Sequence, residues 1–159
     1  MGREIRRVPP NWNHPINSWG AYQPMHEINY SEAAKEWIEN FYEHEEKKLK
    51  EPTAIDYGYY WEYDNPPDES YCVPYRREEA TWYQVYETVS EGTPVTPPFE
   101  TQEELIDHLV CFGESLIGKY NNGPVGREAA TRFVMETQWV MSGMLSNGEF
   151  KCGIGCLEP

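Results

Sequence analysis

The spacing of apolar residues predicts a first helix over residues 31–50. Ser31 is a natural N-cap, and the last turn is rich in lysine, which the helix dipole favours. Pro52 lies just beyond the expected end of the helix. One stripe of this helix is apolar and is expected to face the core; it consists of Ala34, Trp37, Ile38, Phe41 and Leu49.

A second helix is predicted over residues 78–90, where apolar side chains recur three, four and seven positions apart. Its inward stripe would consist of Trp82, Val85, Tyr86 and Val89. Gly92 suits the C-cap of such a helix. The following "TPVTPP" favours an extended, polyproline-like segment.

Two more helices are predicted in the second half of the chain. Thr101 and Glu104 form a capping box that opens the third helix, and Gly113 ends it. Its inward face would consist of Leu105, Ile106, Leu109 and Val110. The fourth helix is predicted over residues 127–138, with Ala130, Phe133 and Val134 facing inward.

Strands are predicted near both ends of the chain. "REIRRV", residues 3–8, favours a short edge strand, and Asn147-Gly148 is a strong hairpin signal within "VMSGMLSNGEFKCGIG". "YGYYWEY", residues 57–63, is a further candidate strand. The prolines of "PPNWNHPINSWGAYQPM" exclude regular structure there, and this segment is expected to be held to the body by the rings of Trp12, Trp19 and Tyr22.

These elements predict an α+β fold in a single compact domain over residues 1–159. It would have about four helices and a small antiparallel sheet that includes the C-terminal hairpin. Residues 1–30 would form a proline- and tryptophan-rich arm packed on that body. Only 39% of the residues are hydrophobic, but 14% are aromatic, and large rings bury much area each.

The charge of the chain limits the kinds of molecule that it is expected to bind. The formal net charge is −14, and residues 51–114 hold fifteen acidic but only two basic side chains. Direct binding of nucleic acid relies on Lys and Arg against phosphate and is therefore not expected. The acidic segment is either an ordinary solvated surface or a face that binds a basic partner.

Several classes of protein lack support in the sequence. No apolar run is long enough to span a membrane, and the basic start of the chain has no apolar stretch of a signal peptide after it, so we expect a cytoplasmic protein. The glycine-rich loops that hold nucleotides and the common hydrolase motifs are missing. Cys152 and Cys156 are four residues apart and could bind metal or pair, but the scattered cysteines and histidines do not predict a zinc site. We expect no cofactor and no metal.

Two constellations are candidates for binding. In the first, an arginine fork at Arg6 or Arg7 would hold a phosphate or carboxylate, unless these arginines pair with the chain's own acidic residues. In the second, rings and the stiff loop after them would stack and hydrogen-bond a flat ligand, unless the rings are core. The full candidate set is Arg6, Arg7, Trp12, His14, Trp82, Tyr83, Tyr86, Glu91, Thr93 and Thr96.

Two blocks of the chain are similar to a known group of proteins. "GREIRRVPPNWNHP" and "ATWYQVYETVSEGTPVTPPFETQEELIDHL", residues 2–15 and 80–109, resemble uncharacterised proteins encoded by tailed bacteriophages and prophages. The group shows a Trp-Ala-Pro-Ser step near its C-terminus, of which only Trp139 is matched here, in "QWVMSGML". The resemblance implies a phage origin and the cytoplasm of an infected bacterium, but it carries no activity.

Three functions remain open from the sequence. The first is a phage accessory protein that acts by binding, antagonising a host defence factor through its acidic, tyrosine-rich surface; its partner would be a host protein with a basic surface. The second is a sponge for a nucleotide-type small molecule. The third is an enzyme with a convergent, unrecognised site. Self-association is left open.

Overall fold

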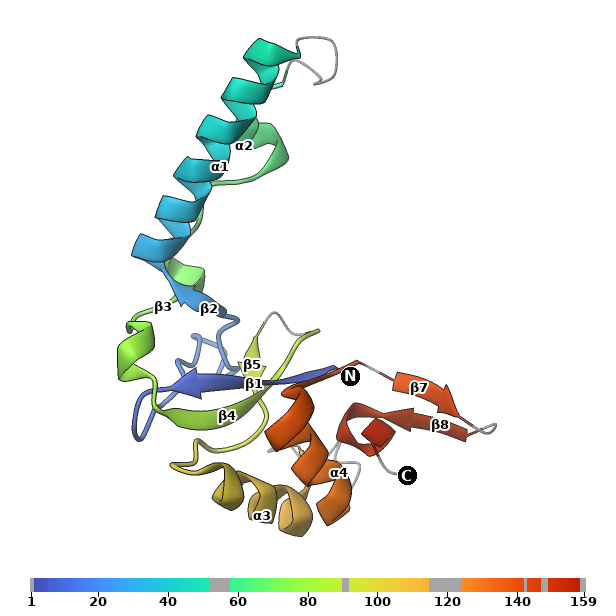
Figure 1. Ribbon diagram of the computed structural model, residues 1–159. Coiled ribbons are helices and arrows are strands. Elements are labelled where there is room, and N and C mark those ends of the chain that lie inside the picture. Colours follow the sequence, from blue (N-terminus) through green and yellow to red (C-terminus); the bar gives the residue numbers. More distant parts are fainter. Residues whose placement is uncertain are drawn as a thin grey trace. The chain divides into compact units, whose positions relative to one another are not determined.

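The computed structural model describes residues 2–51, 58–89, 92–114, 124–141, 143–146 and 149–157 (Figure 1). The chain is an α+β domain, as predicted, and four α-helices lie within the described residues. Its residues cluster into two compact units. We call Met1–Met25 with Tyr75–Pro159 the sheet unit, and His26–Pro74 the helix unit.

The sheet unit is built on a four-stranded antiparallel sheet. The strands are β1 (Arg3–Val8), β4 (Trp82–Glu87), β5 (Thr93–Pro94) and β6 (Trp139–Val140), in the order β5-β4-β1-β6. β1 pairs with β4 along its whole length, with Ile5 opposite Val85 and Arg7 opposite Tyr83. The predicted strand over residues 3–8 is thus confirmed, although β1 lies inside the sheet rather than at its edge.

The predicted helix over residues 78–90 is wrong. A short 3₁₀ turn, Arg77–Glu79, precedes β4, and Gly92 caps no helix. Val85 and Tyr86 are adjacent in sequence and both buried, because a central strand is covered on both faces, whereas Val89 is 57% exposed. The aromatic and β-branched residues of β4 favour a strand. The helical spacing of the apolar residues was coincidental, and pairing with β1 makes this segment a strand.

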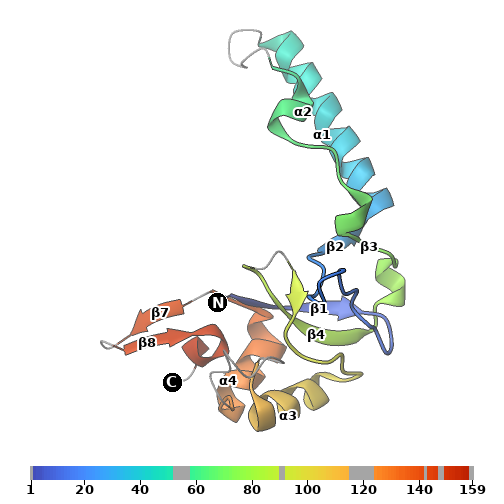
Figure 2. The ribbon, with the colours of Figure 1, turned by 180° about the vertical axis from the view of Figure 1, so that it is seen from behind.

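Helices α3 (Gln102–Phe112) and α4 (Arg127–Thr131) lie on one side of this sheet in both views (Figures 1 and 2). The predicted capping box between Thr101 and Glu104 is present, and Gly113 ends α3 with a φ of 80°. α4 continues as a π-helix, Arg132–Thr137, so the predicted helix over residues 127–138 is confirmed with a wider last turn. Val85, Val140 and the inward residues of both helices belong to one core. These inward residues are Leu105, Ile106, Leu109, Ala130, Phe133 and Val134.

The C-terminal hairpin is also confirmed. Strands β7 (Gly143–Ser146) and β8 (Glu149–Cys152) are antiparallel, and Ser146 lies opposite Glu149. The hairpin forms a two-stranded sheet of its own instead of joining the larger sheet. A 3₁₀ helix, Gly153–Leu157, follows and buries Ile154 in the core. The side chain of Cys152 lies outside the described residues, so a link to Cys156 stays a prediction.

The N-terminal segment after β1 is irregular, as the prolines predicted. Its main local pairing is an isolated bridge between Ile16 and Tyr22. Trp12 packs edge-on against Tyr75 with ring centroids 4.9 Å apart, which confirms one of the expected anchors. Trp19 is 89% exposed and is not an anchor.

The helix unit contains α1 (Tyr30–Lys50), α2 (Tyr60–Tyr63), a 3₁₀ turn (Glu69–Tyr71) and a parallel pair of β2 (His26–Asn29) with β3 (Cys72–Val73). Asn29, not Ser31, caps α1 by accepting a hydrogen bond from the Glu32 amide at 3.0 Å. The tyrosine-rich segment predicted as a strand is the short helix α2 in its described part, residues 60–63.

The apolar stripe of α1 does not face a core. No residue of α1 is buried, and Ile38 and Leu49 are 48% and 83% exposed. Trp37, Phe41 and His44 instead surround the ring of Tyr60, at centroid distances of 5.2, 5.9 and 5.3 Å. The helix unit is held by this cluster of rings, which is too small to cover the whole stripe.

Among the described residues of the sheet unit, Arg3 forms the most buried ion pairs. Its guanidinium lies 3.2 Å from a Glu87 carboxylate oxygen and 3.8 Å from one of Glu114, whose side chain is as buried as its own. Glu114 also accepts a hydrogen bond from the Ile154 amide at 3.0 Å, which connects β1 to the C-terminal helix.

We expect Arg3→Met to lower the free energy of unfolding by about 3–5 kcal/mol, because it leaves buried carboxylates without their cation. Urea unfolding of the purified variant measures the loss. The double variant Arg3→Met with Glu114→Gln should recover part of it, since the second change removes the uncompensated charge. Additive losses in the double variant would show that the two side chains are not coupled.

Candidate functional site

Five of the predicted ligand-binding residues lie close together, and their contacts are made within the chain. Arg6, Trp12, His14, Tyr86 and Thr96 belong to a cluster that also includes Gln84, which we call the Tyr86 cluster. Tyr86 is 2% exposed and lies at its centre. The Arg6 guanidinium lies 4.7 Å from the centroid of the Tyr86 ring, a cation–π contact.

The hydroxyl of Tyr86 joins three side chains. It accepts a hydrogen bond from Trp12 Nε1 at 3.2 Å, donates to Gln84 Oε1 at 3.1 Å, and lies 3.1 Å from His14 Nδ1. The other imidazole nitrogen, Nε2, lies 2.6 Å from the carbonyl oxygen of Gln23 and therefore carries a proton. Burial is the main reason why the pKa of His14 is lowered; the Gln23 carbonyl acts against it and the Arg6 charge adds to it.

Thr96 and Gln84 close the cluster on the side of β5. Gln84 donates to the Thr96 carbonyl at 2.7 Å, and the Thr96 hydroxyl accepts from the Val85 amide at 3.1 Å. Arg6 is bound by Glu4 at 2.6 Å and donates to the Met25 carbonyl oxygen. The polar groups that a ligand would use are thus hydrogen-bonded within the chain. The same bonds anchor the N-terminal segment to the sheet.

The remaining predicted site residues that the structure describes lie outside the Tyr86 cluster, and two of them, Arg7 and Tyr83, contact each other. The Arg7 guanidinium stacks on Tyr83, 3.9 Å from the ring centroid, and donates to the Thr81 carbonyl at 2.9 Å. Thr93 belongs to β5, opposite Glu87. Glu91 lies outside the described residues. The arginines are thus engaged by the chain itself, which was the alternative to a phosphate fork.

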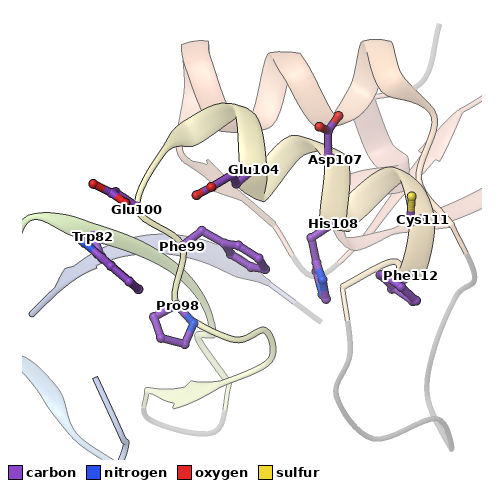
Figure 3. Close-up of a pocket in the computed structure, with 9 residues that line it drawn as sticks. All are labelled: Trp82, Pro98, Phe99, Glu100, Glu104, Asp107, His108, Cys111 and Phe112. Atoms are coloured by element: carbon purple, nitrogen blue, oxygen red, sulfur yellow. The ribbon is translucent and has the colours of Figure 1, made fainter. Parts of the chain in front are cut away.

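Trp82, a further residue of the predicted set, lines a cavity. This open groove of about 460 Å³ runs along α3, entirely within the sheet unit (Figure 3). We call it the α3 groove. Its lining consists of Trp82, Pro98, Phe99, Glu100, Glu104, Asp107, His108, Cys111 and Phe112.

One side of the α3 groove is aromatic. His108 lies between two rings, with its centroid 4.9 Å from that of Phe99 and 5.2 Å from that of Phe112. Phe99 is fixed by two backbone hydrogen bonds of 2.8 Å with Tyr83, at the end of β4. Burial lowers the pKa of His108, so its imidazole is neutral at neutral pH and adds no positive charge to the groove.

The other side of the groove is acidic. Asp107 leaves α3 on the side opposite the His108 ring, Glu104 lies one turn before His108 on the same stripe, and Glu100 lies just before the helix (Figure 3). Arg127 pairs with Asp107 and, at 3.6 Å, with Glu103, which offsets part of this charge. The groove therefore combines an apolar floor with a negatively charged edge.

Sequence reasoning missed most of this site. It identified the inward face of the third helix and its capping box but not the neighbouring stripe of Glu104, His108 and Cys111, which is spaced four and three residues apart. A search for a second helical face that mixes rings with carboxylates would have indicated it. Phe99 could not have been assigned, because only its pairing with Tyr83 places it beside α3.

No helix in the described part of the chain is both long and apolar enough to cross a membrane. In the same residues, His, Cys, Asp and Glu side chains do not gather in groups of three that could hold a metal ion. No family model, curated protein or solved structure matches the chain at a significant level. The similarity to phage proteins consequently stays a prediction.

The lowered pKa of His14 predicts loss of stability in mild acid. The folded-state pKa lies below that of the unfolded chain, so the unfolded chain takes up the proton first as the pH falls. This contribution to stability is complete above about pH 6.5, the ordinary histidine value, and declines below it. Urea midpoints measured between about pH 7.5 and 5.5 should therefore fall with pH.

His14→Gln should reduce this pH dependence, whatever it does to stability at pH 7.5. His108→Gln should also reduce it, because burial lowers that pKa as well. The matched control is His26→Gln, which changes an exposed histidine of β2 and should leave the slope unchanged. A wild-type slope in His14→Gln would contradict the assignment.

Proposed function

We propose that this protein acts by binding, and that its α3 groove takes up a basic side chain of a partner protein. The observation that carries the proposal is the pairing of an aromatic floor with a carboxylate edge in one groove. Lysine and arginine have an apolar stem and a charged head, so both parts of such a side chain would find a matching surface.

The aromatic floor can contribute directly to binding a cation. The faces of Trp and Phe rings attract ammonium and guanidinium groups, with about 0.5–1 kcal/mol per contact at exposed sites. Trp82, Phe99 and Phe112 line the groove, and Phe112 is 64% exposed and therefore accessible. Aromatic residues are enriched at protein interfaces relative to the rest of the surface.

Charge supports a basic partner over a nucleotide-type ligand. The nine residues that line the groove include three carboxylates and neither lysine nor arginine. A phosphate in the groove would be repelled, whereas a basic protein would be steered toward a chain with a net charge of −14. The geometry therefore favours protein binding over a nucleotide sponge.

The similarity to phage proteins suggests the biological setting of this proposal. If the chain comes from a phage, its partner is a protein of the bacterial host, and occupying a basic surface would block that partner's contacts with other molecules. Antagonism of a host defence factor that uses its basic surface on nucleic acid is one such outcome. This setting rests on the resemblance, and the binding mode rests on the groove.

We expect a fluorescein-labelled nona-arginine peptide to bind the wild-type protein in a salt-dependent manner. Glu100→Gln with Glu104→Gln should weaken the Kd about five- to tenfold at about 50 mM salt, because two carboxylates leave the groove edge. Fluorescence anisotropy measures the affinity. Phe112→Ser should weaken binding without changing the net charge.

The matched control is Glu78→Gln with Glu136→Gln, which removes the same charge from exposed positions outside the groove. It should change the Kd less than twofold at the same salt concentration. Equal weakening by both charge variants, together with no effect of Phe112→Ser, would show that binding is non-specific attraction to an acidic surface.

A further inference from the structure

The long helix α1 exposes apolar side chains on a face that the described residues of its own unit leave uncovered. Tyr30, Ile38, Tyr42 and Leu49 are 44, 48, 67 and 83% exposed. Helices in proteins gain most of their stability from packing one face, yet no residue of α1 is buried. An additional partner for this helix is therefore expected.

Ile38, Tyr42 and Leu49 lie on one continuous stripe of α1. Ser31, Lys35, Ile38, Tyr42, Glu45 and Leu49 are separated alternately by four and three positions, which is the spacing of a coiled-coil seam. At about 100° per residue, this stripe lies roughly a third of a turn away from the face that carries Trp37 and His44. The contacts around Tyr60 consequently leave the stripe open.

The charges along α1 are unevenly distributed. The first seventeen residues, from Tyr30 to Glu46, contain six glutamates and one lysine, whereas the last four contain three lysines. A parallel pair of these helices would bring lysine ends together and glutamate segments together. An antiparallel pair would place the lysine end of each helix beside the acidic start of the other.

We propose that α1 pairs in antiparallel orientation with α1 of a second copy of this chain, through this exposed stripe. With the two-fold axis near residue 40, Ile38 of one copy packs on Tyr42 of the other, and Leu49 packs on Ser31 and Tyr30. Lys35 then lies beside Glu45 and Glu46 of the second copy, and Glu32 lies beside Lys50. The antiparallel arrangement thus pairs apolar positions with one another and opposite charges with one another.

One contact in this arrangement is unfavourable. Glu39 lies on the flank of the stripe close to the axis, so the two copies bring their Glu39 side chains together. Within one chain Glu39 is 3.9 Å from Lys35, an exposed pair whose loss changes stability little. The arrangement therefore predicts that removal of this negative charge strengthens self-association.

Sedimentation equilibrium of the full chain tests the proposal between about 5 and 200 µM. We expect twice the monomer mass at the upper end. Ile38→Glu with Tyr42→Glu should give a monomer, and Glu39→Gln should lower the dimer Kd about two- to fivefold. The matched control is Val89→Glu, which places a charge on an exposed apolar residue of the sheet unit and should leave the dimer intact.

Disulfide trapping tests the orientation in a Cys111→Ser background, because Cys111 is exposed. In the antiparallel pair, the two Leu49 positions are about 27 Å apart along the helices, at 1.5 Å per residue. Leu49→Cys alone should therefore not cross-link, whereas a mixture of Leu49→Cys and Ser31→Cys should. Circular dichroism confirms that each variant is folded.

A monomer at all concentrations, or a dimer unaffected by Ile38→Glu with Tyr42→Glu, would overturn the proposal. Efficient cross-linking of Leu49→Cys alone would overturn the antiparallel orientation. The groove peptide assay is independent of these measurements, because α1 and the α3 groove belong to different units.

Discussion

The pairing of β1 with β4 is the interaction on which the rest of the sheet unit depends. Six consecutive residues of each strand are in register, from Arg3 opposite Glu87 to Val8 opposite Trp82. This register brings Arg3 to its carboxylates, Arg6 to the ring of Tyr86 and Arg7 to the ring of Tyr83. Because side chains alternate between the faces of a strand, a slip of one residue would separate all three arginines from these partners.

The register also explains how three arginines near the start of an acidic chain are engaged by the chain itself. Each has a partner within the sheet unit, and two of them are buried. A buried guanidinium needs several acceptors, and the chain supplies them from Glu4, Glu87, Glu114 and the Met25 carbonyl. Some of the acidic residues of the chain are thus needed to pair with the arginines of β1.

The sequence predicted elements well where local signals agree with the tertiary structure. The capping box at Thr101, the inward residues of α3 and α4, and the two strands around Asn147-Gly148 depend on local chemistry and were confirmed. Residues 82–87 were misassigned because burial on both faces removes the alternation by which a strand is recognised. The partner of a central strand lies far away in sequence, and a short window cannot contain it.

Prediction of the candidate site was limited for the same reason. Five of the ten predicted ligand residues did come together, but as a network whose hydrogen bonds are made within the chain. The α3 groove depends on a bridge between Tyr83 and Phe99 and on the outer face of α3. That outer face carries polar and exposed aromatic residues, which single-sequence reasoning treats as solvated surface.

The acidic edge of the α3 groove is also compatible with the stability of the helix that carries it. Glu103 and Glu104 lie in the first turn of α3, where the helix dipole favours negative charge, and Glu104 additionally accepts a hydrogen bond from the Thr101 amide at 3.2 Å. Farther along, Asp107 is paired with Arg127. Carboxylates gathered for binding usually repel one another, but here the helix start and one arginine offset that repulsion. The negative edge on which the proposed binding of a basic side chain depends is thus compatible with a stable α3.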